Sequence, residues 1–492
     1  MKNLFAFLLC LFILCSITGK AQKPAMKVAQ PNVAMTSIDD GAFRFEDYFL
    51  DKTMRVDYYH AGTAREEHFA IDQIVSDGKW PGSKVVTMEN LNLGLYYFEI
   101  KDKGTGNPIY SRGFSSVFGE WQSIPEAATN WGAFPESIRF PWPKKPFTVI
   151  LKKRNQENIF QEIWTKEIDP ASRIVNPADL KPTHIVDVVV DNGPAETKVD
   201  IVILGDGYAS NQMNKFRNDV KRLSDVLLNN EPFKSRKKDI NIRAVETPSE
   251  EPGVNKPHPG VFKRTPLSVH YGSFDSERYA LTYDNKTIRD VAAEVPYDFM
   301  IILVNERTYG GGGIYNLYTT VSADNKFANY IMVHEFGHHM AGLADEYYTS
   351  SVSYEAPEIQ AEPWEPNITN LKDKEHLKWK ELIATETPLP TPWNKAEFDQ
   401  FGYKIQKQRD SIRAIKAPET VMEDLFMRQK QQEDAYFSAE KFKDKVGAFE
   451  GGDYMQFGLY RPQVDCIMFT RHMTFCKVCR KTLDLVMDQY TH

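Results

Sequence analysis

The stretch YIMVHEFGHHMA, residues 330–341, determines how the second half of this 492-residue chain is expected to fold. It contains no proline and follows a cap candidate at Ser322, so it predicts a helix from about Asp324 to Ala341. Residues four apart lie on one face of a helix. His334 and His338 can therefore present imidazole nitrogens to a single metal ion at about 2.0–2.1 Å, a distance typical of zinc.

Glu335 stands next to the first of these histidines and would flank the metal. A carboxylate there can take a proton from a zinc-bound water and return it to the departing amine of a peptide bond. The pattern therefore predicts hydrolysis of peptide bonds with Glu335 as general base. His339 is one position out of phase, so we expect it to support a ligand or to face solvent. The alternative is a helix that carries two histidines by chance.

A third ligand is expected just after this helix. Gly342 suits the left-handed turn that follows a helix C-terminus, and Asp345 and Glu346 come directly after it. A tight turn would bring one acidic oxygen back under the metal. We favour Asp345 as the third ligand and keep Glu346 as the alternative, although both acids could merely cap the helix or support the ligands. Three protein ligands leave one coordination site open, which is typical of a catalytic zinc, one ion per chain.

The residues before this helix alternate between strand and helix patterns. An apolar run at 199–204 leads into a helical pattern over 213–227, and further strand-like runs lie at 240–245 and 297–304. The last of these has the continuous apolar character of a strand buried on both faces. We therefore expect an α/β zinc metallopeptidase catalytic domain over residues 185–492.

Four consecutive glycines, Gly310, Gly311, Gly312 and Gly313, separate the last predicted strand from the metal helix. Such a run lets another backbone come close. It could form an edge on which an extended peptide substrate adds as a strand, or a flexible loop. It is not a phosphate loop, because the Lys-Ser/Thr ending of such a loop is absent.

The first half of the chain has a different pattern. From about Phe43 to Ser115, short alternating runs are separated by turn clusters, and further runs follow at 147–151 and 158–164. These predict an N-terminal β-sandwich domain over residues 22–170. A segment with spaced prolines and no periodicity predicts a linker at 171–184.

Composition and the N-terminus narrow the class of protein. The net charge of -7 is spread along the chain and argues against a nucleic-acid partner. A lysine, an apolar run at 4–14 and small residues up to Ala21 predict a signal peptide over residues 1–21, so the protein is expected to be exported, secreted or periplasmic. No later segment approaches the roughly 20 apolar residues of a transmembrane helix.

Three cysteines follow that signal, namely Cys466, Cys476 and Cys479. An exported protein tends to oxidise two of them. We favour a disulfide of Cys466 with Cys476 or Cys479, because a two-residue gap more often makes a redox or metal hairpin. A structural zinc site is not favoured, because it needs four ligands and the sequence offers no obvious second pair.

Several short segments resemble one peptidase family. The glycine and the acid after the second histidine resemble the metzincin group of zinc peptidases, with both displaced by one residue. Together with GDGY at 205–208, YGGGGIYN at 309–316 and GLADEYY at 342–348, this displacement resembles the bacterial IgA-peptidase family of zinc metallopeptidases. The resemblance covers the second half, and the β-rich first half is similar to the family's N-terminal domain. It implies a metzincin-like fold and a protein or peptide substrate, for which immunoglobulin is one candidate.

The same resemblance implies a methionine turn beneath the metal. DCIM at 465–468 looks like that turn, so Met468 would form an apolar floor, the alternative being an ordinary core methionine. Some metzincins place a tyrosine two residues later as a transition-state ligand, but this chain has Thr470 there. Tyr460 and Arg461 are the candidate transition-state helpers that remain.

Two other functions compete with secreted proteolysis. One is a non-catalytic surface or glycan-binding protein with a relic metal site, which the intact metal motif disfavours. The other is processing of a narrow endogenous substrate, or of this chain at residues 171–184. The sequence does not indicate the natural substrate or the oligomeric state.

Overall fold

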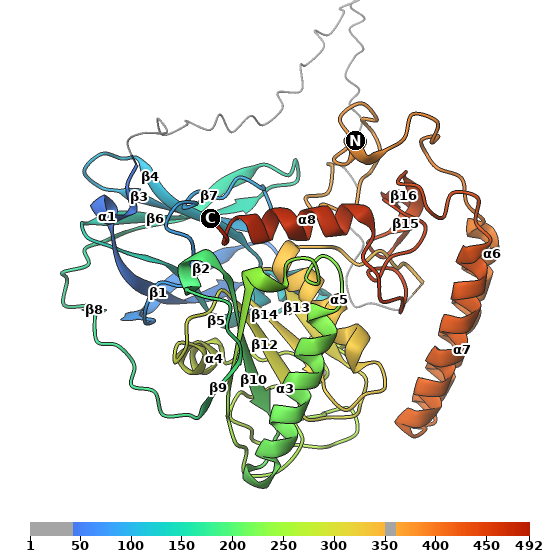
Figure 1. Ribbon diagram of the computed structural model, residues 1–492, viewed down its shortest axis with the longest axis horizontal. Coiled ribbons are helices and arrows are strands. Elements are labelled where there is room, and N and C mark those ends of the chain that lie inside the picture. The colour runs from blue at the N-terminus through green and yellow to red at the C-terminus, as the bar shows by residue number, and fades with distance from the viewer. Residues whose placement is uncertain (1–42, 350–360) are drawn as a thin grey trace, which may run out of the picture. The chain divides into compact units, whose positions relative to one another are not determined.

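A six-stranded mixed sheet lies at the centre of the second half in the computed structural model, which describes residues 43–349 and 361–492 (Figure 1). In spatial order its strands are β13 (Gly311–Ile314), β14 (Tyr318–Ser322), β12 (Phe299–Val304), β10 (Val199–Asp206), β11 (Ile240–Val245) and β9 (Val186–Val190). The four inner strands run parallel, and β13 and β9 pair antiparallel at the two edges. The three strands predicted at 199–204, 240–245 and 297–304 are confirmed.

Helices cover both faces of this sheet. They are α2 (Val117–Gln122), α3 (Met213–Leu228), α4 (Asn285–Ala292), α5 (Ala328–Ala341) and α8 (Lys477–Asp488). Successive side chains of a strand point to opposite faces. Ile201 and Ile203 of β10 therefore pack in a core with α3, α5 and α8, whereas Val202 and Leu204 pack in a second core with α4 and α2. Because α2 belongs to the first half, that second core is shared by both halves of the chain.

The first half contains two four-stranded sheets. One has the order β5 (Gly132–Pro143), β1 (Phe49–Gly62), β2 (Glu67–Ser76) and β8 (Val175–Asn176). The other has the order β4 (Pro108–Phe114), β3 (Tyr96–Asp102), β6 (Phe147–Arg154) and β7 (Phe160–Ile168). Aromatic rings of the two sheets touch, with centroids 5.9 Å apart for Tyr58 and Trp164 and 6.2 Å apart for Phe98 and Phe140. A short helix, α1 (Phe45–Tyr48), precedes β1.

The remaining elements extend from the second half. Helices α6 (Lys395–Ala414) and α7 (Glu419–Ser438) contact each other, and β15 (Phe449–Gly452) pairs antiparallel with β16 (Met455–Arg461). Within the segment predicted as a linker, β8 adds to β2 in parallel. The predicted signal peptide lies outside the described residues. None of the described helices is both long and apolar enough to cross a membrane.

The metal helix α5 begins later than the sequence pattern predicts. Ser322 is the last residue of β14, and α5 starts only at Ala328. The Asn325 side chain accepts a hydrogen bond from the backbone N–H of Phe327 at 2.9 Å and so holds a turn before the helix. The helix ends as predicted at Ala341, where Gly342 adopts a left-handed φ of 58°.

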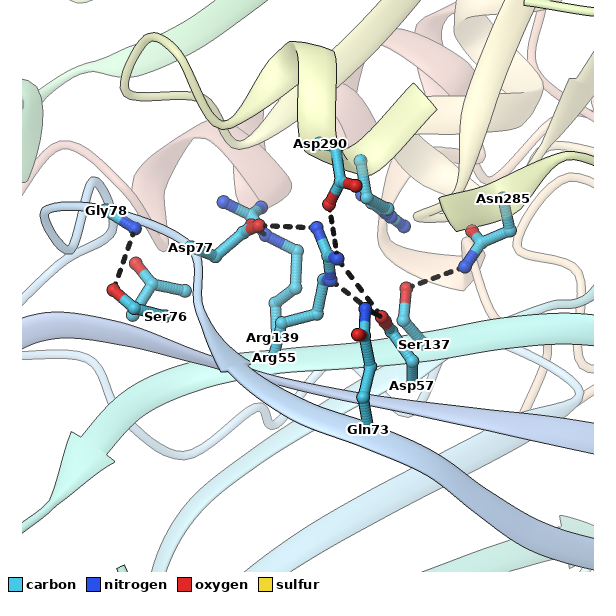
Figure 2. A network of polar contacts seen from close by, with 12 residues as sticks. Arg55, Asp57, Gln73, Ser76, Asp77, Gly78, Ser137, Arg139, Asn285 and Asp290 are labelled. Atoms are coloured by element: carbon cyan, nitrogen blue, oxygen red, sulfur yellow. Dashed lines mark hydrogen bonds and ion pairs between the residues drawn. The ribbon is translucent and has the colours of Figure 1, made fainter. Parts of the chain in front are cut away.

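A buried ion-pair network joins the first half to α4 (Figure 2). The Arg55 side chain on β1 is fully buried, and its guanidinium contacts Asp57 at 2.9 Å, Asp77 at 2.8 Å and Asp290 of α4 at 2.6 Å. Arg139 of β5 contacts the second oxygen of Asp77 at 2.5 Å. Charges removed from water need such partners, so this network ties β1 and β5 firmly to the helix that covers the central sheet.

Candidate metal centre

Three predicted ligand residues meet at one point of the structure. The Nε2 atoms of His334 and His338, one turn apart on α5, are 3.2 Å from each other. Asp345 Oδ1 lies 3.1 Å from the first and 3.2 Å from the second. The left-handed Gly342 donates its N–H to His338 O at 2.9 Å and turns the chain back toward the helix. This turn is what returns Asp345 to the histidines.

The hydrogen bonds of the two imidazoles show which nitrogen of each ring is free to bind a metal. His334 Nδ1 is 3.0 Å from the carbonyl oxygen of Ile467, and His338 Nδ1 is 2.5 Å from that of Leu343. A carbonyl oxygen only accepts, so each Nδ1 donates a proton and each Nε2 can offer a lone pair. A tetrahedral zinc ion with ligands at about 2.0–2.1 Å would hold its nitrogens about 3.3 Å apart, close to the observed separation. The spacing of His334, His338 and Asp345 therefore fits a bound zinc ion.

The electrostatics of these residues also favour a bound cation. Burial lowers the pKa of His338, the Asp345 carboxylate raises it, and the net pKa is about 9. The carboxylate pKa of Asp345 is held well below its usual range; burial opposes this shift, but the two histidines outweigh it. The site therefore favours a positive charge between these groups, and metal binding would displace the proton.

Glu335 is buried, with 9% of its surface exposed, and lies beside the two histidines. One ligand atom from each of His334, Glu335 and His338 can be chosen so that all three lie within 4.8 Å of one another. His339, in contrast, faces the sheet: its Nδ1 donates to Ile314 O at 3.1 Å and its Nε2 accepts from Met300 N at 3.2 Å. Burial lowers the His339 pKa to about 3, so this ring is neutral and fastens α5 to β12 and β13.

A turn runs beneath the metal centre where the methionine turn was predicted. Phe469 N–H donates to Cys466 O at 2.9 Å, which closes the turn. The next carbonyl, that of Ile467, holds His334, and Met468 O accepts from Glu346 N at 2.7 Å. The Met468 side chain is fully buried. The turn therefore supports the first histidine and the loop that carries Asp345.

Glu346, the alternative third ligand, points away from the histidines. Its Oε1 accepts from Asn367 Nδ2 at 3.0 Å and lies 3.6 Å from Cys479 Sγ. Asp345 is instead fixed by Tyr454, whose hydroxyl donates to Asp345 Oδ2 and leaves Oδ1 toward the imidazoles. Of the two acids, the geometry favours Asp345 as ligand.

The expected disulfide is not formed. Cys466, Cys476 and Cys479 are free thiols. Cys479 Sγ is 3.9 Å from Cys466 Sγ and 3.4 Å from Cys476 Sγ, whereas a disulfide needs about 2.05 Å. The sequence prediction is corrected here because all three sulfurs converge on one point with Glu346, so no two of them are set apart as a pair.

The candidate transition-state helpers do not reach the metal centre. Tyr460 pairs through its backbone with Thr369, at 2.9 and 3.1 Å. Arg461 is fully buried and donates to the carbonyls of Glu450, Gly451 and Val464. Neither residue is among those that line the cleft above the metal centre. The hydrogen bonds of the Arg461 guanidinium to these backbone carbonyls hold its side chain away from the cleft.

A cleft of about 930 Å³ opens over the metal centre and is lined by both halves of the chain. Arg278, Tyr347 and Tyr454 are among the polar side chains of its walls that sequence analysis missed. Arg278 Nη2 donates to the Tyr347 hydroxyl at 3.0 Å. Tyr347 belongs to the GLADEYY segment and could have been noticed there. No local pattern marks the other two.

Three of the four glycines, Gly311 to Gly313, belong to the edge strand β13 along this cleft, and Gly310 precedes it. Gly311 N–H donates to Arg278 O at 3.2 Å, so it points away from β14. Backbone groups in an antiparallel strand alternate in direction. The N–H and C=O of Gly313 therefore also point away from β14, as those of Gly311 do. A side chain at Gly313 would meet Glu335 O at 2.1 Å and His338 Cβ at 2.9 Å. Glycine is needed there because β13 passes directly against α5.

We expect Gly313→Ala to destabilise the protein by about 1–3 kcal/mol, because the added methyl group forces β13 and α5 apart. Urea unfolding measures the loss. Gly104→Ala is the matched control, since its methyl group would meet only the Asp102 carboxylate at 3.3 Å. Equal stabilities for the two variants would contradict the close approach of β13 to the metal helix.

Two family models match the two halves of the chain. Residues 188–487 match a family model described as IgA Peptidase M64. Residues 44–165 match a second model, described as Peptidase M64 N-terminus. No curated protein matches the chain.

Proposed function

We propose that this chain, which belongs to the IgA peptidase M64 family, is a zinc-dependent endopeptidase. Family membership makes it a peptidase. The observation that carries the finer proposal is the triangle of His334 Nε2, His338 Nε2 and Asp345 Oδ1, with sides of 3.1–3.2 Å, in the floor of a cleft. Two imidazoles and one carboxylate are a ligand set typical of a catalytic zinc with an open position.

Zinc held by these residues would supply Lewis acidity to the scissile carbonyl and to the attacking water. Glu335 takes the proton of that water on its carboxylate and returns it to the nitrogen of the departing amine. Tyr454 keeps Asp345 in the orientation that leaves Oδ1 free. Arg278 and Tyr347 are the cleft residues we propose as donors to the developing oxyanion, in place of Tyr460 and Arg461.

An extended peptide would bind at Gly313 of β13, because the outward N–H and C=O of Gly311 already pair with residues 278–280. The outward N–H and C=O of Gly313 are suited to pairing with a substrate backbone, which is the mode of recognition called β-augmentation. Ser115, Ser116 and Gln122 of the first half line the same cleft and would contact substrate side chains. The substrate class is protein or peptide, and immunoglobulin is one candidate within it.

Two further points belong to this proposal. We infer a β-sandwich for the two sheets of the first half, from the ring contacts between them, and a metzincin-like arrangement for α5, the Asp345 loop and the turn at Met468. We also infer export, from the apolar run at 4–14 that precedes the small residues up to Ala21.

Removal of the metal tests the proposal. We expect a chelator to lower cleavage of a mixed peptide library by about 10³-fold or more, because Lewis acidity accounts for several kcal/mol of the barrier. Added zinc should restore activity. His338→Ala should lose one zinc per chain and the activity together. Chelator-resistant cleavage would refute the metal mechanism, and metal-independent binding of a glycan without any cleavage would favour the binding-protein alternative.

A further inference from the structure

Three cysteines and one glutamate form a buried cluster next to the candidate metal centre. Glu346 directly follows Asp345, Cys466 begins the turn beneath His334, and Cys476 and Cys479 lie at the N-terminus of α8. All four side chains are at most 4% exposed. One ligand atom from each lies within 4.8 Å of every other. Segments more than a hundred residues apart thus bring four metal-ligating groups to one point.

The spacing of these atoms matches a tetrahedral metal site. Cys479 Sγ is 3.9 Å from Cys466 Sγ, 3.4 Å from Cys476 Sγ and 3.6 Å from Glu346 Oε1. A tetrahedral zinc ion with sulfurs at about 2.3 Å and an oxygen at about 2.0 Å would hold the sulfurs about 3.8 Å apart and the oxygen about 3.5 Å from each of them. The observed separations scatter around these values.

Two of the three sulfurs accept backbone hydrogen bonds. Cys466 Sγ accepts the backbone N–H of Cys476 at 3.2 Å, and Cys476 Sγ accepts that of Cys479 at 3.4 Å. Both donors lie at the N-terminus of the 12-residue helix α8, which carries partial positive charge. Backbone donors and a helix N-terminus stabilise the thiolate form, which is the form that binds metal.

A disulfide would leave this cluster unsatisfied. It would use two sulfurs and leave the third beside a buried carboxylate. Glu346 Oε2 is buried and has no hydrogen-bond partner among the described residues, and such a group is costly unless it is paired or binds a metal. Three thiolates and one carboxylate carry four negative charges. A divalent cation together with buried Arg461, which interacts electrostatically with Glu346 and Cys466, would neutralise most of them.

We propose that Glu346, Cys466, Cys476 and Cys479 bind a second zinc ion in a closed, structural site. Four protein ligands leave no position for water or substrate, which separates this site from the catalytic one. The ion would join the Asp345 loop, the turn that holds His334 and the start of α8. It would thereby position two ligands of the first centre. The proposal does not depend on peptidase activity, since it concerns only the binding of zinc by these four side chains.

Zinc K-edge X-ray absorption of the purified, full-length protein tests this site without any substitution. The ligands of the first centre contain no sulfur, so every zinc–sulfur distance must come from the cluster. We expect two zinc ions per chain and an average of about 1.5 sulfurs per zinc at about 2.3 Å. Zinc with only nitrogen and oxygen neighbours would overturn the proposal, whether or not the protein cleaves peptides.

Two reciprocal variants separate the sites. Cys479→Ser should lose the sulfur signal, whereas His338→Ala should lose one zinc and keep the other with about three sulfurs. If Cys479→Ser does not fold, the absorption spectrum of the unsubstituted protein still shows whether zinc is bound by sulfur. Alkylation after unfolding in a chelator without reductant, followed by peptide mass spectrometry, should modify all three cysteines. A disulfide between any two of them would refute the site.

Discussion

Glu335→Gln should lower kcat by about 10²–10⁴-fold, the usual contribution of general acid–base catalysis, while both the zinc content and the melting temperature stay unchanged. The amide has nearly the same shape as the carboxylate but cannot take a proton from water. Glu335 lies beside the two histidines without replacing either as a ligand, so its loss should leave the metal in place. Peptide cleavage under saturating substrate and metal analysis of the same sample measure the two quantities.

Glu120→Gln is the matched control for that experiment. Glu120 is another carboxylate that lines the cleft, but it comes from α2 of the first half. We expect its replacement to change kcat by less than about threefold, since it makes no proton transfer in the proposed reaction. A Glu335→Gln enzyme that keeps its zinc and full activity would show that the proposed base is wrong.

Arg55→Leu should destabilise the folded protein by about 3–5 kcal/mol. The substitution leaves Asp57 and Asp77 buried beside β1 without one of their positive partners, and it cuts the link to Asp290 of α4 (Figure 2). An uncompensated buried charge costs far more than a lost surface pair. Chemical denaturation, followed by tryptophan fluorescence, measures the difference.

Lys103→Leu provides the comparison for Arg55→Leu. The Lys103 and Glu167 side chains are 51% and 61% exposed, so the loss of this ion pair should cost less than about 1 kcal/mol. A similarly small loss for Arg55→Leu would mean that water reaches the network. It would also mean that Asp57 and Asp77 are not held by Arg55.

The sequence predicted the parts of this site that lie close together along the chain. The spacing of His334 and His338, the glycine that ends their helix and the acid three residues later are local features. The continuous apolar strands were also predictable, because burial on both faces leaves a clear pattern. Each of these depends on a few neighbouring residues, and local periodicity describes them well.

The remaining features of the site depend on contacts between segments that are distant in the sequence. Tyr454 reaches Asp345 across 109 positions, and Glu346 meets Cys479 across 133. The sequence placed Cys466 beside Cys476 or Cys479 only as a disulfide partner, and the folded chain adds Glu346 to the three sulfurs. Tyr460 and Arg461 fail for the same reason, since the packing around β16, not their residue type, directs them away from the cleft.

The shared second core has a consequence for protein engineering. Val202 and Leu204 of the catalytic half are covered partly by Phe118, Trp121 and Phe134 of the first half. A fragment expressed from residue 185 onward would present this apolar sheet face to solvent and would be prone to aggregate. Chimeras between relatives should therefore exchange both sides of this contact as one unit. Each new cleft wall is then transferred together with the surface on which it packs.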